Sequence, residues 1–196
     1  MITLLDRRPI IVALAGPNGA GKSTFYRAFL GSSGLRFVNA DQIGLQLKID
    51  AYRAAQVAEE LREYLVSARE SFIFETVFSD PVGDKLGFLQ EAQKLGYTVV
   101  LFFIGIDGTE TSRERVAMRV LKGGHDVPTS KLESRYSRTI ENLRRSLVTL
   151  PNVAVYDNSD LLKPYRLVAE IRDAHIRRFP PTPIWLQPLR FGAFEK

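Results

Sequence analysis

One nine-residue segment, Gly16–Thr24, constrains the fold of this chain more than any other feature. It reads GPNGAGKST and matches the pattern GxxxxGK followed by serine or threonine, which cradles phosphate groups. The apolar run Pro9–Ala15 before it predicts a buried strand, and Lys22–Leu30 after it predicts a helix that ends at Gly31. This order predicts a binding site for a nucleoside triphosphate, because backbone N–H groups and the helix dipole both attract anions.

The motif also assigns roles to individual side chains. We expect Lys22 to reach the β- and γ-phosphates and the Ser23 hydroxyl to be a ligand of Mg²⁺. The residues predicted to contact ATP or GTP are Gly16, Pro17, Asn18, Gly19, Ala20, Gly21, Lys22, Ser23 and Thr24. The alternative is a glycine-rich turn with a purely structural role between strand and helix.

Outside this motif, short apolar runs alternate with longer amphipathic stretches. The other predicted strands are Leu35–Asn39, Ser71–Val77, Tyr97–Ile106 and Val153–Tyr156. The other predicted helices are Ala51–Arg69, Val82–Leu95, Thr109–Lys122, Thr129–Leu150 and Lys163–Arg178. The alternation predicts an α/β fold of the P-loop NTPase, kinase-like type, a three-layer sandwich around a central parallel sheet of about five strands. We expect one domain, 1–196, with ligands at the carboxyl ends of the strands.

The composition excludes several kinds of site and partner. With no cysteine and two histidines, the chain cannot form disulfides, thiolate sites or a multi-histidine metal centre. No apolar run reaches the roughly 20 residues of a membrane span, and polar residues at 6–8 interrupt any signal-peptide pattern. We therefore expect a cytoplasmic protein that does not bind membranes. The net charge of +5 indicates an anionic partner.

Basic residues crowd into one stretch, which we expect to form an arginine-rich helical lid over about residues 109–150. Arg115 and Arg119 are four residues apart on one predicted helix, and Arg135 and Arg138 are three apart on the next. Arginines placed in this way can stabilise the charge that spreads over a phosphoryl group during its transfer. The alternative is an ordinary solvated helix surface.

Acidic residues follow two of the predicted strands. Asp41 follows the second strand, where a carboxylate can accept the proton of an attacking hydroxyl, or can simply cap the next helix. Glu75 and Thr76 end the third strand, so Glu75 could hold Mg²⁺ or bind an acceptor hydroxyl. The alternative for Glu75 is a structural carboxylate that caps the neighbouring loop. A motor-type ATPase is disfavoured, because Asp107 follows Gly105-Ile106 without an Asp-Glu pair.

Together these residues resemble the zeta toxin family of P-loop kinases, in its short stand-alone chromosomal branch that is often labelled a predicted ABC-type ATPase. The resemblance is carried, in order, by Gly16–Thr24, Asn39–Asp41, Phe74–Thr76, Arg115–Val120, Gly123–Pro128, Arg135-Tyr136 and Tyr156–Ser159. The P-loop is shared by many families. The Gly-Gly-His-Asp-Val-Pro stretch with its flanking arginines is much more specific.

The resemblance implies a kinase that uses ATP or GTP with Mg²⁺ and phosphorylates the 3′-hydroxyl of UDP-N-acetylglucosamine. By resemblance, Asp41 is the general base, and Lys22, Arg119 and Arg135 complete the catalytic set, with Arg115 and Arg138 as rivals for the arginines. Glu75 and Thr76 fall on the acceptor or metal side. Asp157 and Asn158 are expected to hold the nucleotide base. An epsilon-type antitoxin is the protein partner that the family implies.

Two other functions use the same motifs. The first is a nucleic-acid 5′-hydroxyl kinase, which the basic charge permits; against it, only Tyr136 supplies an aromatic side chain among the basic helices. The second is a nucleotide-binding switch without phosphoryl transfer, in which the proline-rich tail, about residues 179–196, binds a partner. We expect Trp185 of this tail to pack onto the domain instead, because an exposed indole is costly.

Overall fold

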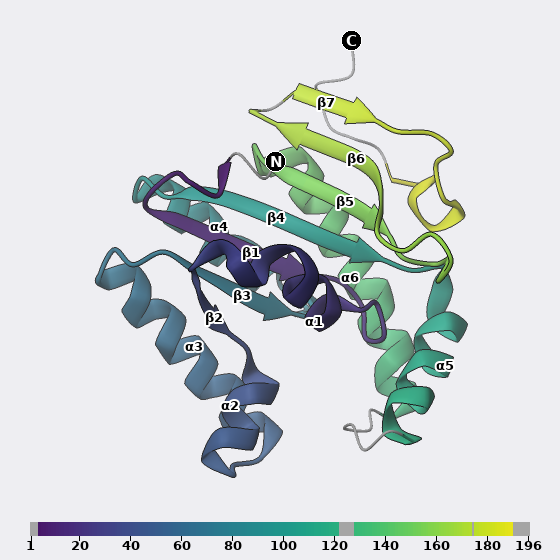
Figure 1. Cartoon of the computed structure of the whole chain (residues 1–196), viewed down its shortest axis with the longest axis horizontal. Coiled ribbons are helices and arrows are strands. Elements are labelled where there is room, and N and C mark those ends of the chain that lie inside the picture. The colour runs from purple at the N-terminus through teal and green to yellow at the C-terminus, as the bar shows by residue number, and fades with distance from the viewer. Residues whose placement is uncertain (1–3, 122–127, 174, 190–196) are drawn as a thin grey trace.

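The computed structural model describes residues 4–121, 128–173 and 175–189 (Figure 1). Its sheet has seven strands in the order β2-β3-β1-β4-β5-β6-β7. Their bounds are β1 Ile10–Ala15, β2 Arg36–Val38, β3 Phe72–Thr76, β4 Thr98–Gly105, β5 Val153–Asp157, β6 Arg166–Arg172 and β7 His175–Arg178. Strands β1 to β5 pair in parallel with one another, β6 pairs antiparallel with β5, and β7 pairs antiparallel with β6. The α/β class is confirmed, with seven strands rather than about five.

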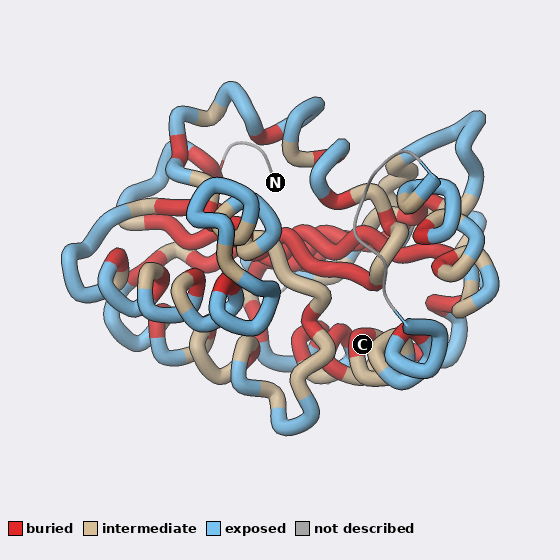
Figure 2. Tube along the Cα trace, turned by 90° about the horizontal axis from the view of Figure 1, so that it is seen from below, coloured by how far each residue is buried: buried red, intermediate tan, exposed pale blue. Residues whose placement is uncertain are grey.

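Helices cover both faces of this sheet. They are α1 Lys22–Phe25, which continues as a π-helical turn Tyr26–Leu30, α2 Ala40–Leu47, α3 Ala51–Ser67, α4 Asp84–Lys94, α5 Gly108–Leu121 and α6 Thr129–Thr149. One core packs α3, α4 and α6 on one face, and the other packs α1 and the amino-terminal segment on the opposite face. The strands form the buried middle layer in Figure 2. The predicted three-layer sandwich is therefore present.

Strand β1 lies at the centre of the five parallel strands, and this position explains why its sequence is apolar throughout. Ile11, Ala13 and Ala15 pack into one core, and the residues between them pack into the other. Every residue of the strand is buried, so both of its faces exclude water. A parallel strand that is covered on both sides shows a continuous apolar run rather than an alternating one.

The predicted helix Lys163–Arg178 is wrong, because this segment forms the antiparallel strands β6 and β7. Leu167 packs into one core, whereas Ala169 and Ile171 pack into the other. Since both faces of β6 meet apolar neighbours, the period of two that marks a half-exposed strand is lost. Pairing with β5 then decides the conformation.

The described part of the tail packs against the carboxyl ends of β4 and β5. Trp185 is 7% exposed, and its ring lies 6.1 Å from that of Phe103 between the ring centroids. The indole Nε1 donates a hydrogen bond of 3.0 Å to the carboxylate of Asp157. The prediction that Trp185 packs onto the domain is confirmed. Within the residues that the structure describes, no helix is both long enough and apolar enough to span a membrane.

Candidate active site

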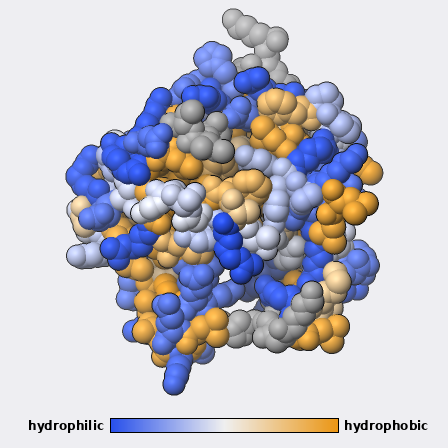
Figure 3. All heavy atoms as spheres, viewed as in Figure 1, coloured by the Kyte–Doolittle hydropathy of each residue, from blue (hydrophilic) through white to orange (hydrophobic). Residues whose placement is uncertain are grey.

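A cavity of about 1580 Å³ opens at the carboxyl ends of the parallel strands. The P-loop and the end of β3 form its floor, α2 and the start of α3 form one wall, and α5 with the first half of α6 forms the other. The space-filling view shows the molecule hollowed between the α2 lobe and the α5–α6 lobe (Figure 3). This is the position at which open parallel sheets bind ligands, as predicted.

The P-loop conformation depends on its glycines. Gly16, Gly19 and Gly21 have φ angles of 145°, 74° and 87°, a region that favours glycine. A Cβ atom at Gly16 would lie 2.1 Å from the carbonyl oxygen of Ile104 in β4. The loop can therefore approach the sheet closely only with glycine at this position.

Side chains from distant parts of the chain hold the carbonyl groups of this loop. Ser112 of α5 donates to the Asn18 carbonyl oxygen at 2.7 Å. Asn158, which follows β5, donates to Ala20 at 2.8 Å, and Tyr165 donates from its hydroxyl to Gly21 at 3.0 Å. The loop is thus fixed before a ligand arrives, and the first N–H groups of α1 have no partners within the helix. We call Ser112, Asn158 and Tyr165 the loop clamp.

Lys22 lies at the centre of the cavity floor, and only 7% of it is exposed. Its Nζ donates to the carbonyl oxygens of Gly16 at 2.9 Å and Pro17 at 3.1 Å. A carboxylate oxygen of Glu75 lies 3.9 Å away. Burial lowers the pKa of the Lys22 ammonium below its usual value, although Glu75 and Asp41 favour its charged form.

Glu75 is the acidic partner of the P-loop. Its Oε2 accepts hydrogen bonds from the Ser23 hydroxyl at 3.0 Å and from the Asn39 side-chain amide at 2.9 Å. A hydroxyl and a carboxylate beside a phosphate cradle suit Mg²⁺, which keeps most of its waters and binds through few protein oxygens. The described residues contain no group of three or more acidic, histidine or cysteine side chains that could hold a metal by themselves. The donor set therefore fits a phosphate-bound Mg²⁺ better than a metal held by the protein alone.

Asp41 lies on α2, a helix that the sequence analysis did not predict as a separate element. The N-cap of this helix is Asn39, whose Oδ1 accepts a hydrogen bond of 3.0 Å from the Gln42 N–H. The alternative in which Asp41 caps the helix is therefore wrong. Its carboxylate is exposed and lines the cavity, where a base would need to be.

The four candidate arginines differ in their position relative to the cavity and in their hydrogen bonds. They are Arg115, Arg119, Arg135 and Arg138. Arg119 and Arg135 line the cavity. Arg115 also borders it, but both of its terminal nitrogens donate to backbone carbonyls, those of Asn158 at 2.7 Å and of Ser159 at 2.8 Å. Arg138 is not among the lining residues, and its Nε donates to the carbonyl of residue 79 at 2.8 Å. Arg119 and Arg135 thus both line the cavity, and their role as transition-state arginines stays a prediction.

Three predicted ligand-binding residues have internal partners instead. The Thr76 hydroxyl accepts a hydrogen bond from the Phe78 N–H at 2.9 Å. Asp157 binds Trp185 and forms a 3.2 Å ion pair with Arg166. As described above, Asn158 belongs to the loop clamp. None of Thr76, Asp157 and Asn158 is among the residues that line the cavity.

The predicted lid divides into two parts. Leu143 and Leu147 of α6 are buried in the core, and Asn142 donates to two carbonyls of the β3–α4 loop at 3.0 Å each. The second half of α6 is therefore part of the body of the domain. The first half and α5 wall the cavity. The segment Gly123–Val127, with His125, lies outside the described residues.

The sequence analysis assigned no role to Ser112, Tyr165 or Asn39, although Asn39 belongs to a segment that carries the family resemblance. Asn39 could have been found, because asparagine directly before a helical stretch is a favoured N-cap. Ser112 lies within a predicted helix and Tyr165 within a segment predicted to be helical, so neither carried a signal for contact with the P-loop.

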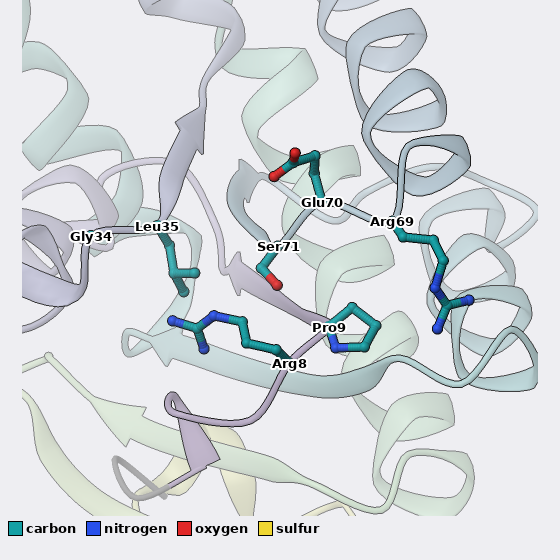
Figure 4. A pocket seen from close by; sticks show the side chains of 7 residues that line it. All are labelled: Arg8, Pro9, Gly34, Leu35, Arg69, Glu70 and Ser71. Carbon is teal, nitrogen blue, oxygen red and sulfur yellow. The ribbon is translucent and has the colours of Figure 1, made fainter.

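A second, smaller pocket of about 480 Å³ lies at the opposite end of the sheet, near the amino ends of β1 and β3 (Figure 4). Its arginines already have backbone partners. Arg8 donates to the carbonyls of Leu5 and Arg7, and Arg69 donates to that of Leu95 at 3.1 Å. The pocket is separate from the P-loop cavity.

The sheet order, the P-loop and the cavity define the fold class of P-loop kinases. The zeta toxin family model matches residues 48–167, which is more than half of the chain. The protein belongs to the zeta toxin family. The P-loop and Asp41 precede the matched range.

Several known proteins are similar to this chain. A Haemophilus influenzae protein is 28% identical over 126 residues, covering 62% of this chain and 88% of that protein. The ATP-bound AvrRxo1-ORF1:-ORF2 complex has a chain with a TM-score of 0.69 and 18% identity, covering 88% of this chain. The protein described here spans only 61% of the length of that AvrRxo1 complex chain. The Streptococcus pneumoniae PezAT toxin–antitoxin system has a TM-score of 0.67 and 17% identity, covering 96% of this chain and 80% of that one. At these identities the solved structures show a shared fold.

Proposed function

We propose that the protein is a kinase that transfers the γ-phosphate of ATP to a hydroxyl of a nucleotide sugar. One observation carries the proposal: a single cavity is lined by the P-loop lysine Lys22, the carboxylate of Asp41 and the guanidinium groups of Arg119 and Arg135. Phosphoryl transfer needs a phosphate cradle, a group that accepts the hydroxyl proton and cations around the transferred group. These requirements are met by different walls of the same cavity.

In this mechanism the P-loop seats the triphosphate, with Lys22 moving from its carbonyl partners to phosphate oxygens. Ser23 and Glu75 would hold Mg²⁺, which supplies charge neutralisation on the phosphates when bound. The 3.0 Å hydrogen bond between the Ser23 hydroxyl and the Glu75 carboxylate keeps their oxygens adjacent.

On the acceptor side, Asp41 accepts the proton of the attacking hydroxyl as the new phosphorus–oxygen bond forms. The bond between the γ-phosphorus and the bridging oxygen breaks, and the electron pair leaves with ADP. Arg119 and Arg135 stabilise the charge on the transferred group. The walls formed by α2 and α5–α6 limit access of water, so that the acceptor hydroxyl competes with hydrolysis.

The acceptor that we propose is the 3′-hydroxyl of UDP-N-acetylglucosamine, on the basis of family membership. An antitoxin is proposed as a partner on the same basis, since the similar PezAT structure is that of a toxin–antitoxin system. A nucleic-acid kinase is less favoured. The hydroxyl of Tyr136 donates to Ile106 at 2.9 Å and accepts from Gly108 at 3.1 Å, so this side chain has a structural role.

The test is a transfer assay on the whole chain with Mg²⁺, ATP and a panel of acceptors, with products identified by mass spectrometry. The panel contains UDP-N-acetylglucosamine, other nucleotide sugars, free sugars and a 5′-hydroxyl oligonucleotide. Lys22→Ala and Asp41→Asn are the inactive controls. The expected result is one added phosphate on a nucleotide sugar, lost in both variants.

Other outcomes contradict the proposal in different ways. Phosphate on the oligonucleotide alone would establish the nucleic-acid kinase. ATP bound without transfer to any acceptor would favour the switch. Product formation that is unchanged in Asp41→Asn would remove Asp41 from the role of base.

A further inference from the structure

Strands β2 and β3 are neighbours in the sheet, and the register between them determines which side chains meet beside the P-loop (Figure 1). Val38 lies opposite Phe74 in this parallel pair, so the next step of the register places Asn39 opposite Glu75. The backbone of Asn39 is still extended, with a φ of −136° and a ψ of 120°, although this residue is the N-cap of α2. Asn39 therefore lies where the strand ends and the helix begins.

The alternation of side chains along the two strands decides the face of the sheet to which Asn39 and Glu75 point. Phe37 and Ile73, two residues earlier, pack against the core on the α1 side of the sheet. Because side chains two residues apart on a strand share a face, Asn39 and Glu75 point to this side as well. Helix α1 begins on this side, with Ser23 in its first turn. The register thus brings an amide and a carboxylate together beside the P-loop.

The two ends of the Asn39 amide have different partners. Its Oδ1 accepts a hydrogen bond of 3.0 Å from the Gln42 N–H, and its Nδ2 donates one of 2.9 Å to Oε2 of Glu75. A backbone N–H needs an acceptor and a carboxylate needs a donor, so these partners allow only one orientation of the amide. Only 6% of Asn39 is exposed, so water has little access to compete for either bond.

These two bonds join opposite sides of the cavity. The bond to Gln42 fixes the first turn of α2, in which Asp41 lies. The bond to Glu75 holds the same oxygen, Oε2, that accepts the hydrogen bond from the Ser23 hydroxyl. A single buried side chain therefore links the helix that carries Asp41 to the carboxylate beside the P-loop.

Asparagine suits this double role better than the other favoured helix caps. Serine, threonine and aspartate can also accept a hydrogen bond from the Gln42 N–H. Aspartate has no donor for Glu75, and the hydroxyl of serine or threonine is on a shorter side chain than the amide nitrogen of asparagine. The bond to Glu75 is thus the feature that distinguishes asparagine from the other caps at this position.

We propose that Asn39 is a positioning residue for phosphoryl transfer, which holds Glu75 in place relative to Asp41; this inference rests on the proposed kinase function. Its amide keeps Oε2 of Glu75 turned toward Ser23, so that the two oxygens proposed to hold Mg²⁺ stay adjacent before a nucleotide arrives. Its cap fixes the helix that presents Asp41. Asn39 is not among the residues that line the cavity, so it acts through these neighbours rather than on the substrate.

The test separates the two bonds of Asn39. Asn39→Ser keeps a favoured cap and removes the donor to Glu75, whereas Asn39→Ala removes both. We expect Asn39→Ser to lower kcat at least about tenfold, as is typical when an outer partner of a metal-binding group is lost. Its melting temperature should fall less than that of Asn39→Ala. Asn39→Thr, a second variant that retains a cap, should behave like Asn39→Ser.

A binding measurement gives a readout without turnover. The affinity for a non-hydrolysable ATP analogue is measured by calorimetry, once with Mg²⁺ and once with EDTA. Mg²⁺ should strengthen binding of the analogue to the wild-type chain, and Asn39→Ser should reduce this gain at least about tenfold. The affinity in EDTA should stay unchanged, because the loop clamp is left intact. A purely structural role as a cap would not alter the effect of Mg²⁺.

Asp50→Ser is the matched control, because it replaces one helix cap by another away from the site. Asp50 is the N-cap of α3, accepts hydrogen bonds from two backbone N–H groups and is not among the residues that line the cavity. This change should leave kcat and the effect of Mg²⁺ as in the wild-type chain. In a Glu75→Ala background, Asn39→Ser should not reduce the effect of Mg²⁺ further, because its partner is already absent.

An unchanged gain from Mg²⁺ in Asn39→Ser would overturn the inference, whatever its kcat, and would leave Asn39 as a helix cap. An equal effect of Asn39→Ser with and without Glu75, or a wild-type chain that gains nothing from Mg²⁺, would overturn it too. The kinase proposal fails separately, if the wild-type chain transfers phosphate to none of the panel acceptors. The calorimetric comparison needs no transfer, so the two failures are distinguishable.

Discussion

At the scale of single residues, side chains of the same type on the same helix differ in whether they already have hydrogen-bond partners within the protein. Arg135 and Arg138 are one turn apart on α6, yet only Arg135 lines the cavity, whereas Arg138 donates to a loop carbonyl. In the same way, Asp41 is exposed to the cavity because Asn39 takes the role of helix cap. The chemistry that each residue can perform depends on whether its polar atoms are already bound.

Arg135→Met should lower kcat for phosphoryl transfer by about 100-fold or more, with a smaller effect on the KM for ATP. The reason is that a cation on the transferred group acts mainly in the transition state. Arg138→Met should lower kcat less than tenfold and reduce thermal stability instead, because it removes a bond to the β3–α4 loop. Steady-state kinetics and circular dichroism melting separate the two, and equal losses of kcat would contradict the assignment.

A surface cluster on α6 gives a pH-dependent effect. Hydrogen bonds from Arg144, at 2.7 and 2.8 Å, and from Arg145 lower the pKa of Glu141 to about 2. A carboxyl with a lowered folded-state pKa stabilises the fold above its ordinary pKa of 4.5, and this contribution disappears as pH falls toward 2.

Glu141→Gln should therefore lower the free energy of unfolding at pH 7 by at most about 1 kcal/mol, since the cluster is solvent-exposed. Urea titrations at several pH values should show the difference shrinking between pH 4.5 and 2. A difference that persists at the acid end would indicate a packing effect instead of a charge effect.

At the scale of elements, the P-loop owes its shape to segments that are far away in sequence. The loop clamp brings together α5, the residue after β5 and the residue before β6. The site therefore depends on the order of the sheet, because β4 and β5 must be neighbours for these side chains to reach the loop.

Tyr165→Phe and Ser112→Ala each remove one hydroxyl that donates to a P-loop carbonyl. We expect each change to weaken ATP binding about three- to tenfold, as a neutral hydrogen bond contributes about 0.5–1.5 kcal/mol. Calorimetric titration with ATP tests this, and Tyr64→Phe, whose side chain is exposed on α3, is the control. Unchanged affinity in both clamp variants would show that the loop holds its shape without them.

The sequence analysis predicted the elements whose pattern is local. The β1–P-loop–α1 unit follows from short-range rules, because the apolar run, the motif and the helix are adjacent in the sequence. Segment 163–178 was predicted to be helical, because its pairing with β5 cannot be deduced from its own residues. Secondary structure at a sheet edge is decided by a partner that is distant in sequence.

The same limit applies to the candidate site. Lys22, Ser23, Asp41 and Glu75 were found because each occupies a recognisable place at the end of a strand or in the motif, and the structure brings them to one cavity. The nucleotide-base role expected of Asp157 and Asn158 stays a prediction; in the structure both have internal partners, and neither is among the residues that line the cavity. Only the fold shows that Asn158 contacts the P-loop, whereas the adjacent Asp157 contacts Trp185.

At the scale of the whole molecule, the described tail covers the carboxyl ends of β4 and β5. Trp185 packs directly over Gly105, where an added Cβ would lie 2.2 Å from the indole ring. Its hydrogen bond fixes Asp157, next to the clamp residue Asn158. The tail is thereby connected to the P-loop through two adjacent residues of one strand end.

Trp185→Ala should lower the free energy of unfolding by about 3–5 kcal/mol, because it removes a large buried ring and leaves Asp157 with one fewer donor. Denaturant titrations followed by far-ultraviolet circular dichroism measure this loss. Ile184→Ala is the control, because Ile184 is 71% exposed and should change stability by less than about 0.5 kcal/mol. A similar loss for the two variants would contradict the packing role of the indole.

The chain has a single tryptophan, and that residue is buried beside the strand end that supports the P-loop. The protein therefore carries an intrinsic fluorophore, and its emission comes from one known place. Exposure of the indole on unfolding would shift this emission to longer wavelengths. Unfolding around the ends of β4 and β5 can thus be followed by tryptophan fluorescence in the unlabelled wild-type chain.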